Sequence, residues 1–232
     1  MTDRFIPLHH STPSGVPEER ARQFLELMNG RRTVRQFSDE PVSEELIRSL
    51  IATAGTAPSG ANKQPWRFVA VRDPAIKREM RAAAEEEERR FYRDRASTEY
   101  LADLDHLGTD EHKSYFDVVP WIIVVFKMVK DPTPDPALGQ SDQVYYLNES
   151  VGIAVGLFLA AARNAGLATL THTPNPMRFL SKLLGRPDYE RPFLIIPVGH
   201  PADDCMVPNI QRKPLEEIMV IDRSGPEQAD RA

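Results

Sequence analysis

Two segments near the N-terminus have apolar residues at the spacing of an amphipathic helix. In residues 17–30, Pro17 opens the segment and acidic residues follow in the first turn, as is common at helix starts. In residues 43–55, Ser43 is a candidate N-cap. The preceding residues 1–16 are polar and are interrupted by proline and glycine. We therefore expect an extended arm followed by two helices.

Three longer segments are also predicted to be helical, and they differ in polarity. Residues 74–95 are mostly polar and include the run EEEE at 85–88, which is typical of a solvated helix face. A further helical stretch is expected from Tyr100 to Phe116. Residues 143–165 form the most apolar of these segments, but charged residues within them indicate a buried helix and not a membrane span.

Four runs rich in β-branched and aromatic residues predict strands. The run at 121–127 is continuously apolar, as expected for a central strand that is buried on both faces. Pro197 indicates a bend or an edge in the last run. A short apolar run at 218–221 has little local support, so it would have to pair elsewhere, with a partner subunit as one option. The four predicted strands are 66–71, 121–127, 167–171 and 192–198.

The composition is that of a globular protein of one or two domains, with 232 residues, 41% hydrophobic and 27% charged. A net charge of -5 argues against a general nucleic-acid binder, which needs a basic face. Cys205 is the only cysteine, so an intrachain disulfide cannot form, which suits a reducing compartment. The sequence has neither the apolar core of a signal peptide nor a run of about 20 apolar residues, so we expect a cytoplasmic protein.

The most informative polar stretch is RRTVR at residues 31–35. Guanidinium groups are planar, always charged and suited to two-point recognition of phosphate. In an extended segment Arg31, Thr33 and Arg35 share one face, so they could converge on one anion. A solvated basic turn is the alternative, and this stretch alone does not decide between the two.

The usual short catalytic motifs are missing from the sequence, which has no G-x-G-x-x-G loop, Walker A loop or Cys/His metal cluster. Ser59 stands in P-S-G and not in G-x-S-x-G, so serine hydrolysis has little support. Three weak signals remain besides the arginine stretch. They are the loop PSGAN at 58–62, the loop THTP at 171–174 and the run RKP at 212–214.

Taken in order, several separated segments resemble the nitroreductase superfamily of flavin enzymes, and within it the iodotyrosine deiodinase branch of reductive dehalogenases. The resemblance runs from about residue 20 to residue 222. The segments that carry it are RRTVRQFS at 31–38, AGTAPSGANKQPWRFVAV at 54–71, EEEERRFY at 85–92, GRPDYE at 185–190 and QRKPLEEIMV at 211–220.

The resemblance implies an α+β fold in which helices flank a mainly antiparallel sheet. It also implies an intertwined homodimer whose C-terminal strands are exchanged, which would account for the unsupported apolar run. The chain would then consist of one domain at 17–222, with an active-site lid at about 85–116 and an exchange tail at about 206–222. Residues 223–232 would form a disordered tail.

The resemblance implies FMN as the cofactor, with its phosphate and ribityl end on the arginine stretch. Arg31, Arg32 and Arg35 would lie there with Arg212, and Thr33 and Val34 belong to the same stretch. Further flavin contacts would come from Ser59 and from Thr171, His172 and Thr173, and the Thr173 hydroxyl would act at flavin N5. Flavins carry the redox chemistry, while the protein tunes it through such hydrogen bonds. The family pattern has threonine where this chain has His172, which leaves the role of that side chain open.

The substrate expected from the resemblance is a free halotyrosine. Glu88 and Tyr92 are four residues apart on one helix face, and Lys113 follows in the next segment. Glu88 would bind the substrate ammonium, Tyr92 and Lys113 its carboxylate, and the Ala61 backbone N–H its phenolate oxygen. Spacing alone favours a simpler interpretation, in which Glu88 only continues the acidic run and Tyr92 is a packing residue.

The reaction implied is FMN-dependent reductive dehalogenation of iodotyrosines to tyrosine and halide. The electrons would come from NAD(P)H or from a separate reductase. Two alternatives are a general nitro or quinone reductase that uses the same FMN, and a flavin-binding protein without turnover. A nitroaromatic has no zwitterion for Glu88, Tyr92 and Lys113 to match, so this set distinguishes the first alternative.

Overall fold

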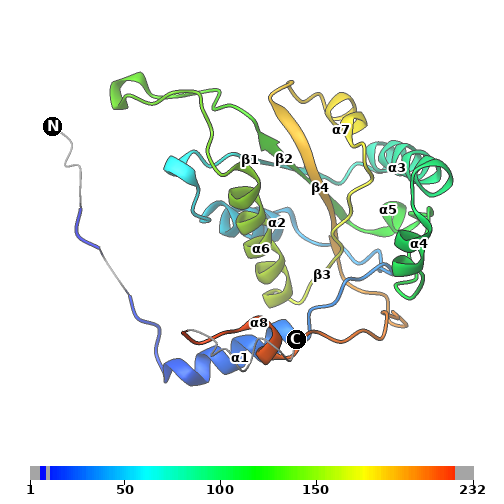
Figure 1. Ribbon diagram of the computed structural model, residues 1–232, viewed down its shortest axis with the longest axis horizontal. Coiled ribbons are helices and arrows are strands. Elements are labelled where there is room, and N and C mark those ends of the chain that lie inside the picture. The colour runs from blue at the N-terminus through cyan, green and yellow to red at the C-terminus, as the bar shows by residue number, and fades with distance from the viewer. Residues whose placement is uncertain (1–5, 9–10, 223–232) are drawn as a thin grey trace.

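The computed structural model describes residues 6–8 and 11–222 (Figure 1). The tail expected at 223–232 and residues 1–5 and 9–10 of the expected arm lie outside the described residues. The described part of the arm contains no helix or strand up to residue 16.

A four-stranded antiparallel sheet forms the centre of the molecule, as the resemblance implies. Its order is β1-β2-β4-β3, which places the continuously apolar run in an interior strand, as predicted. All residues of that strand are buried except Lys127. The strands are β1 (Trp66–Val71), β2 (Trp121–Met128), β3 (Ala168–Thr169) and β4 (Glu190–Gly199).

The bend or edge predicted at Pro197 is wrong, because β4 continues through it between two neighbours. Pro197 lies opposite Ile122 of β2, and its carbonyl accepts a hydrogen bond from Leu170 N–H at 3.3 Å. In antiparallel pairs the N–H and C=O of one residue face the same neighbour. The nitrogen of Pro197, which has no hydrogen to donate, therefore points toward Leu170, just beyond the short β3. The ladder between β4 and β2 loses no hydrogen bond at this position.

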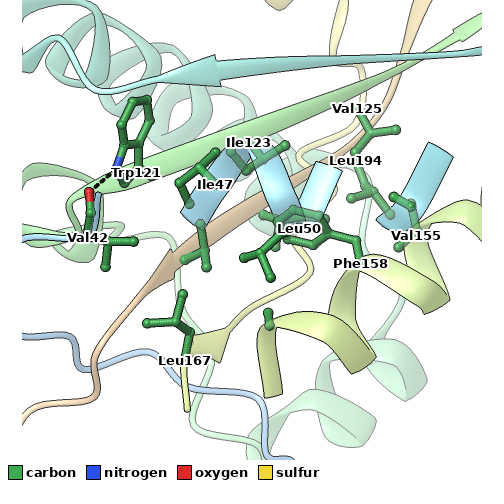
Figure 2. Packing of buried hydrophobic residues seen from close by; sticks show 14 of the residues in the cluster. Val42, Ile47, Leu50, Trp121, Ile123, Val125, Val155, Phe158, Leu167 and Leu194 are labelled. Atoms are coloured by element: carbon green, nitrogen blue, oxygen red, sulfur yellow. Dashed lines mark hydrogen bonds between the residues drawn. The ribbon is translucent and has the colours of Figure 1, made fainter. Parts of the chain in front are cut away.

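One face of the sheet is covered by α2 (Glu44–Gly55) and α6 (Leu147–Asn164) (Figure 2). The Ser43 hydroxyl accepts from Leu46 N–H at 3.2 Å, which confirms the predicted N-cap. α6 begins four residues later than predicted, after Tyr146 in a left-handed conformation. Side chains that form this first core include Ile47, Leu50, Ile123, Val125, Phe158 and Ile196.

The opposite face is covered by α3 (Pro74–Asp94), α5 (Tyr115–Val118) and α7 (Arg178–Leu183). The helix expected from Tyr100 to Phe116 is instead divided into α4 (Thr98–Asp105) and α5, because the chain turns at Gly108 with φ +58°. Side chains of this second core include Met80, Phe116, Ile122, Val124, Phe126, Leu180 and Ile195.

Two helices at the edge of the molecule bury little surface within this chain. α1 (Pro17–Asn29) has no buried residue, and Phe24 and Leu25 are 54% and 59% exposed. α8 (Leu215–Ile218) takes up the start of the strand predicted at 218–221, and the rest of that run forms no strand within the chain. Within the described residues, the helices are too short or too polar to cross a membrane.

Candidate active site

A cavity of about 640 Å³ lies among the end of α3, α4 and the segment that follows β3. It brings together six residues that the sequence singled out from three separate regions: Arg35, Glu88, Tyr92, Thr171, His172 and Thr173. The sheet explains this convergence. Val34 N–H donates to the Thr169 carbonyl at 3.1 Å, so the arginine stretch runs beside β3 and the threonine segment that follows it.

Glu88 and Lys113 form a buried ion pair at this cavity, with Lys113 Nζ 2.6 Å from Glu88 Oε2. At this distance the two charged groups are in direct contact. Burial raises the pKa of Glu88, and Lys113 opposes that rise. Two further contacts hold Lys113 in place. Its backbone N–H donates to Glu85 Oε1 at 2.8 Å, and its side-chain ammonium donates to the Asp110 carbonyl.

His172 is the second buried titratable group beside Glu88. Its Nδ1 lies 3.5 Å from Glu88 Oε1, and the residue is 9% exposed. Burial lowers the pKa of His172 to about 3, and the nearby charges of Lys113 and Arg35 act in the same direction. The ring is therefore neutral at ordinary pH.

Two tyrosines complete the polar side of the cavity. Burial raises the pKa of Tyr92, and the charge of Glu88 raises it further. Tyr115 is almost fully buried, and its pKa is raised by the same two causes in the same order. Both phenols are therefore protonated at neutral pH and can donate to an anion.

The arginine stretch does not converge on one point within this chain, in contrast to the prediction from alternation. Arg31 and Arg32 line a separate cavity of about 280 Å³, whereas Arg35 lines the cavity of Glu88 and His172. Thr33 lines a third cavity, shared with Arg35. The Val34 side chain is buried in the second core, and the residue also lines the cavity of Arg31 and Arg32.

Arg212 joins Arg31 from the C-terminal tail. Its guanidinium donates to the Arg31 carbonyl at 2.8 Å and to the Asn29 carbonyl at 3.3 Å. Burial lowers the pKa of Arg31, and repulsion from Arg212 and Arg32 lowers it further. Such a cluster of like charges is stabilised by a bound anion, which makes it a suitable phosphate site.

Ser59 and Ala61 are not among the residues that line the 640 Å³ cavity of Glu88 and His172. The Ser59 hydroxyl accepts from Gln64 N–H at 2.8 Å, and Ala61 lies in the short 3-10 helix Gly60–Asn62 with φ 50°. In Figure 1 this cyan turn lies to the left of the sheet, whereas α3 and α4 lie to its right. One chain alone therefore does not assemble all the predicted site residues.

Sequence reasoning missed the apolar wall of the large cavity, formed by Phe91, Tyr100, Leu104 and Leu107. The Phe91 and Tyr100 rings meet edge to face with centroids 5.5 Å apart. Positions 100, 104 and 107 have helical spacing, which was the available signal for a shared face. The sequence gives no sign, however, that this face lines a cavity and not the core.

Residues 28–200 match the family model described as the nitroreductase family. The chain belongs to the nitroreductase family. This confirms the family and the fold class expected from the sequence. A nitroreductase-like protein from Streptococcus mutans, 18% identical with a TM-score of 0.65, shares the same fold.

Among members of the nitroreductase family, this chain is especially similar to iodotyrosine deiodinases. It is 50% identical over 220 residues to the iodotyrosine deiodinase of Haliscomenobacter hydrossis, which covers 94% of this chain and 97% of that one. It is 44% identical over 218 residues to human iodotyrosine deiodinase 1, which covers 93% of this chain and 74% of the human one. A crystal structure of oxidised iodotyrosine deiodinase bound to FMN and 3-iodo-L-tyrosine superposes with a TM-score of 0.72 and 30% identity, covering 87% of this chain and 98% of that one.

Proposed function

We propose that this protein is an FMN-dependent iodotyrosine deiodinase. It converts halotyrosines such as 3-iodotyrosine and 3,5-diiodotyrosine to tyrosine and halide. Each carbon–iodine bond that breaks consumes two electrons and one proton, and it yields one carbon–hydrogen bond and one iodide ion. Support comes from the similarity to deiodinases over most of the chain and from the residues around the large cavity.

The observation that carries the proposal is the buried pair Glu88 and Lys113 beside Tyr92. A free amino acid presents an ammonium and a carboxylate, and it needs an opposite charge for each. Glu88 binds the ammonium, and Lys113 and Tyr92 bind the carboxylate. Burial strengthens both contacts, because charges interact more strongly away from water. The apolar wall formed by Phe91, Tyr100, Leu104 and Leu107 accepts the iodinated ring.

FMN supplies the electrons for this reaction when it is bound. The residues fit it, because the repelling guanidinium groups of Arg31, Arg32 and Arg212 suit a phosphate. Arg35, Thr171 and Thr173 line the substrate cavity, so they can hold the isoalloxazine end next to the substrate. The Thr173 hydroxyl would hydrogen-bond flavin N5, and Ser59 would contribute a further hydroxyl. The His172 backbone, whose N–H is bonded to the Ile195 carbonyl, would lie against the flavin. The Ala61 N–H binds the phenolate oxygen.

The site becomes complete in a homodimer, which forms part of the proposal. Ser59 and Ala61 do not line the cavity of Glu88 in one chain, so the partner subunit provides them. The unburied apolar face of α1 and the exposed residues after α8 offer the surface for an intertwined interface. The tail at about 206–222 crosses to the partner and pairs there as a strand. The exposed apolar residues of that tail are Met206, Ile210, Leu215, Ile218, Met219, Val220 and Ile221.

Within a single domain at 17–222, the segment at about 85–116 acts as a lid. It carries Glu88, Tyr92 and Lys113, so closing over the substrate also places the groups that recognise it and excludes water. NAD(P)H or a separate reductase supplies the electrons, and a cytoplasmic location suits the lone Cys205.

An anaerobic assay tests the proposed function directly. The FMN-loaded protein is reduced with dithionite and mixed with 3-iodotyrosine, with tyrosine as the control. We expect reoxidation of the flavin together with one iodide and one tyrosine per flavin. Reoxidation by nitroaromatics or quinones but not by 3-iodotyrosine would establish a general reductase instead. If none of these compounds reoxidised the flavin, the protein would be a flavin-binding protein without turnover.

A further inference from the structure

We infer that His172 is a positioning residue that holds the Glu88 carboxylate in place for the substrate ammonium. The inference rests on the proposed function, since it assigns a further specificity-determining residue to the same site. It concerns the side chain of His172, and the backbone contact with the flavin is separate from it.

The backbone fixes where the His172 ring points. His172 N–H donates to the Ile195 carbonyl at 2.9 Å, and Ile195 N–H donates back to the His172 carbonyl at 2.8 Å. This pair extends the sheet beyond β3 and holds residue 172 in an extended conformation next to β4. The ring packs edge to face on Phe116, with centroids 6.0 Å apart. The backbone bonds to Ile195 and the ring contact with Phe116 together leave the imidazole little freedom to move away from Glu88.

The contact with Glu88 determines which ring nitrogen carries the proton. A neutral imidazole has one donor and one acceptor nitrogen. His172 Nδ1 lies 3.5 Å from Glu88 Oε1, at the outer limit of hydrogen-bond distance, and a carboxylate can only accept. With its proton on Nδ1, the neutral ring can donate to Glu88 Oε1 at this distance. Nε2 is buried and has no hydrogen-bond partner among the described residues, so the ring makes its side-chain polar contact through Nδ1.

A neutral donor is the appropriate partner for Glu88 once the substrate enters. Lys113 Nζ lies 2.6 Å from Oε2, and the substrate carboxylate would compete with Glu88 for the Lys113 ammonium. His172 then keeps Oε1 oriented without adding a positive charge. A second cation at this position would compete with the substrate ammonium for the same carboxylate.

Two substitutions separate the Nδ1 contact from every other property of the ring. In His172→Asn the amide nitrogen can replace Nδ1–H, whereas in His172→Gln the longer side chain places its amide near Nε2. Loss of the contact between Nδ1 and Glu88 Oε1 predicts that His172→Gln raises the KM and Kd for 3-iodotyrosine by about tenfold. We expect the KM and Kd of His172→Asn to stay within about threefold of the wild-type values.

The measurements use the FMN-loaded protein. Kd is obtained from quenching of the oxidised flavin fluorescence, and KM and kcat from iodide release. The substrate analogue 3-(4-hydroxy-3-iodophenyl)propionate lacks the ammonium, so we expect both variants to bind it as the wild type does. Flavin content and thermal unfolding temperature show whether each variant is folded.

The inference would be overturned if His172→Asn and His172→Gln weakened 3-iodotyrosine binding equally. It would also be overturned if His172→Gln weakened binding of the analogue without an ammonium as much as binding of 3-iodotyrosine. If both variants fail to fold, His172→Ser is tested with and without added imidazole. Restoration of 3-iodotyrosine binding by imidazole supports the role of His172, and a lack of restoration contradicts it. A wild type that binds 3-iodotyrosine but releases no iodide contradicts the proposed function, while the Kd values still decide the role of His172. A wild type that does not bind it contradicts both.

Discussion

Glu88 Oε2 and Lys113 Nζ lie 2.6 Å apart and neutralise each other, although the two residues are expected to bind opposite ends of the substrate. Both side chains are largely buried, with 14% and 3% of their surface exposed. A zwitterion can enter by exchange, because its ammonium replaces Lys113 at Glu88 and its carboxylate replaces Glu88 at Lys113. A ligand with only one charge would leave the other buried group without a partner, which is costly. We therefore expect the pair to select for amino acids.

Glu88→Gln removes the charge that binds the ammonium and should weaken 3-iodotyrosine binding by about 30-fold or more. Reduction of a nitroaromatic by the same variant should be nearly unchanged, because that substrate has no ammonium. Glu86→Gln is the matched control, since Glu86 lies on the same helix but pairs with Arg89 and Arg90 outside the cavity. Flavin fluorescence titration and steady-state kinetics provide the two readouts. Equal losses with both substrates would contradict the assignment of Glu88.

Arg212→Gln should lower the affinity for FMN by about tenfold, through the loss of one charge-assisted phosphate contact. The variant also loses the hydrogen bonds to the Asn29 and Arg31 carbonyls that hold the tail against the end of α1. Lys213→Gln is the control, because the neighbouring Lys213 is 72% exposed and pairs with Glu217. Equilibrium dialysis against FMN measures both. Unchanged FMN affinity in Arg212→Gln would exclude Arg212 from the phosphate site.

Truncation after Pro214 should convert the proposed homodimer to a monomer that binds FMN weakly. It removes α8 and the apolar residues 219–221, which are exposed in one chain and so contribute little to its own core. Truncation after Asp222 keeps these residues and should leave the dimer intact. Light scattering coupled to size-exclusion chromatography gives the mass of each. A dimer that survives the first truncation with its FMN would contradict the exchange of the tail.

The buried His172 predicts a pH dependence of stability. Its pKa is about 3 in the folded chain and close to 6.5 in the unfolded chain, so between these values only the unfolded state takes up the proton. The free energy of unfolding therefore falls as the pH falls through this window, by at most about 1.4 kcal/mol per pH unit. The raised pKa of Glu88 acts in the opposite direction, because the folded chain takes up that proton first.

The His172→Asn variant isolates the histidine contribution, since it retains Glu88. Urea unfolding across the acidic pH range should show a smaller loss of stability in the variant than in the wild type. Identical pH profiles would mean that His172 is not held neutral in the folded chain.

The sequence predicted most of the helices and strands, because their signals are local. Neighbouring residues are enough to predict the N-cap at Ser43, the buried strand β2 and the long polar helix α3. The strand expected at 167–171 is regular only at residues 168–169, although His172 still bridges to Ile195. Strand order, and the passage of Pro197 through an interior strand, depend on contacts between distant segments. Periodicity carries no information on such contacts.

The candidate site was predictable as a set of residues but not as an arrangement. The resemblance named Glu88, Tyr92 and Lys113, and the structure places Glu88 and Tyr92 at one cavity with Lys113 against Glu88. Alternation in the arginine stretch did not reveal that Arg31 and Arg35 serve different cavities, because this division depends on the neighbours of each residue. The pairing of His172 with Glu88 joins residues 84 positions apart in the sequence, for which no local signal exists.

The sheet separates two hydrophobic cores that share no buried side chain. Ile122, Val124 and Phe126 of β2 belong to the core under α3, α5 and α7, and the alternate residues belong to the core under α2 and α6. Local openings of proteins follow such cooperative units. Backbone amides of α3 to α5 can therefore exchange with solvent deuterium while those of α2 and α6 stay protected. The chain can thus open locally on the face that carries the cavity of Glu88 without loosening the other face of the sheet.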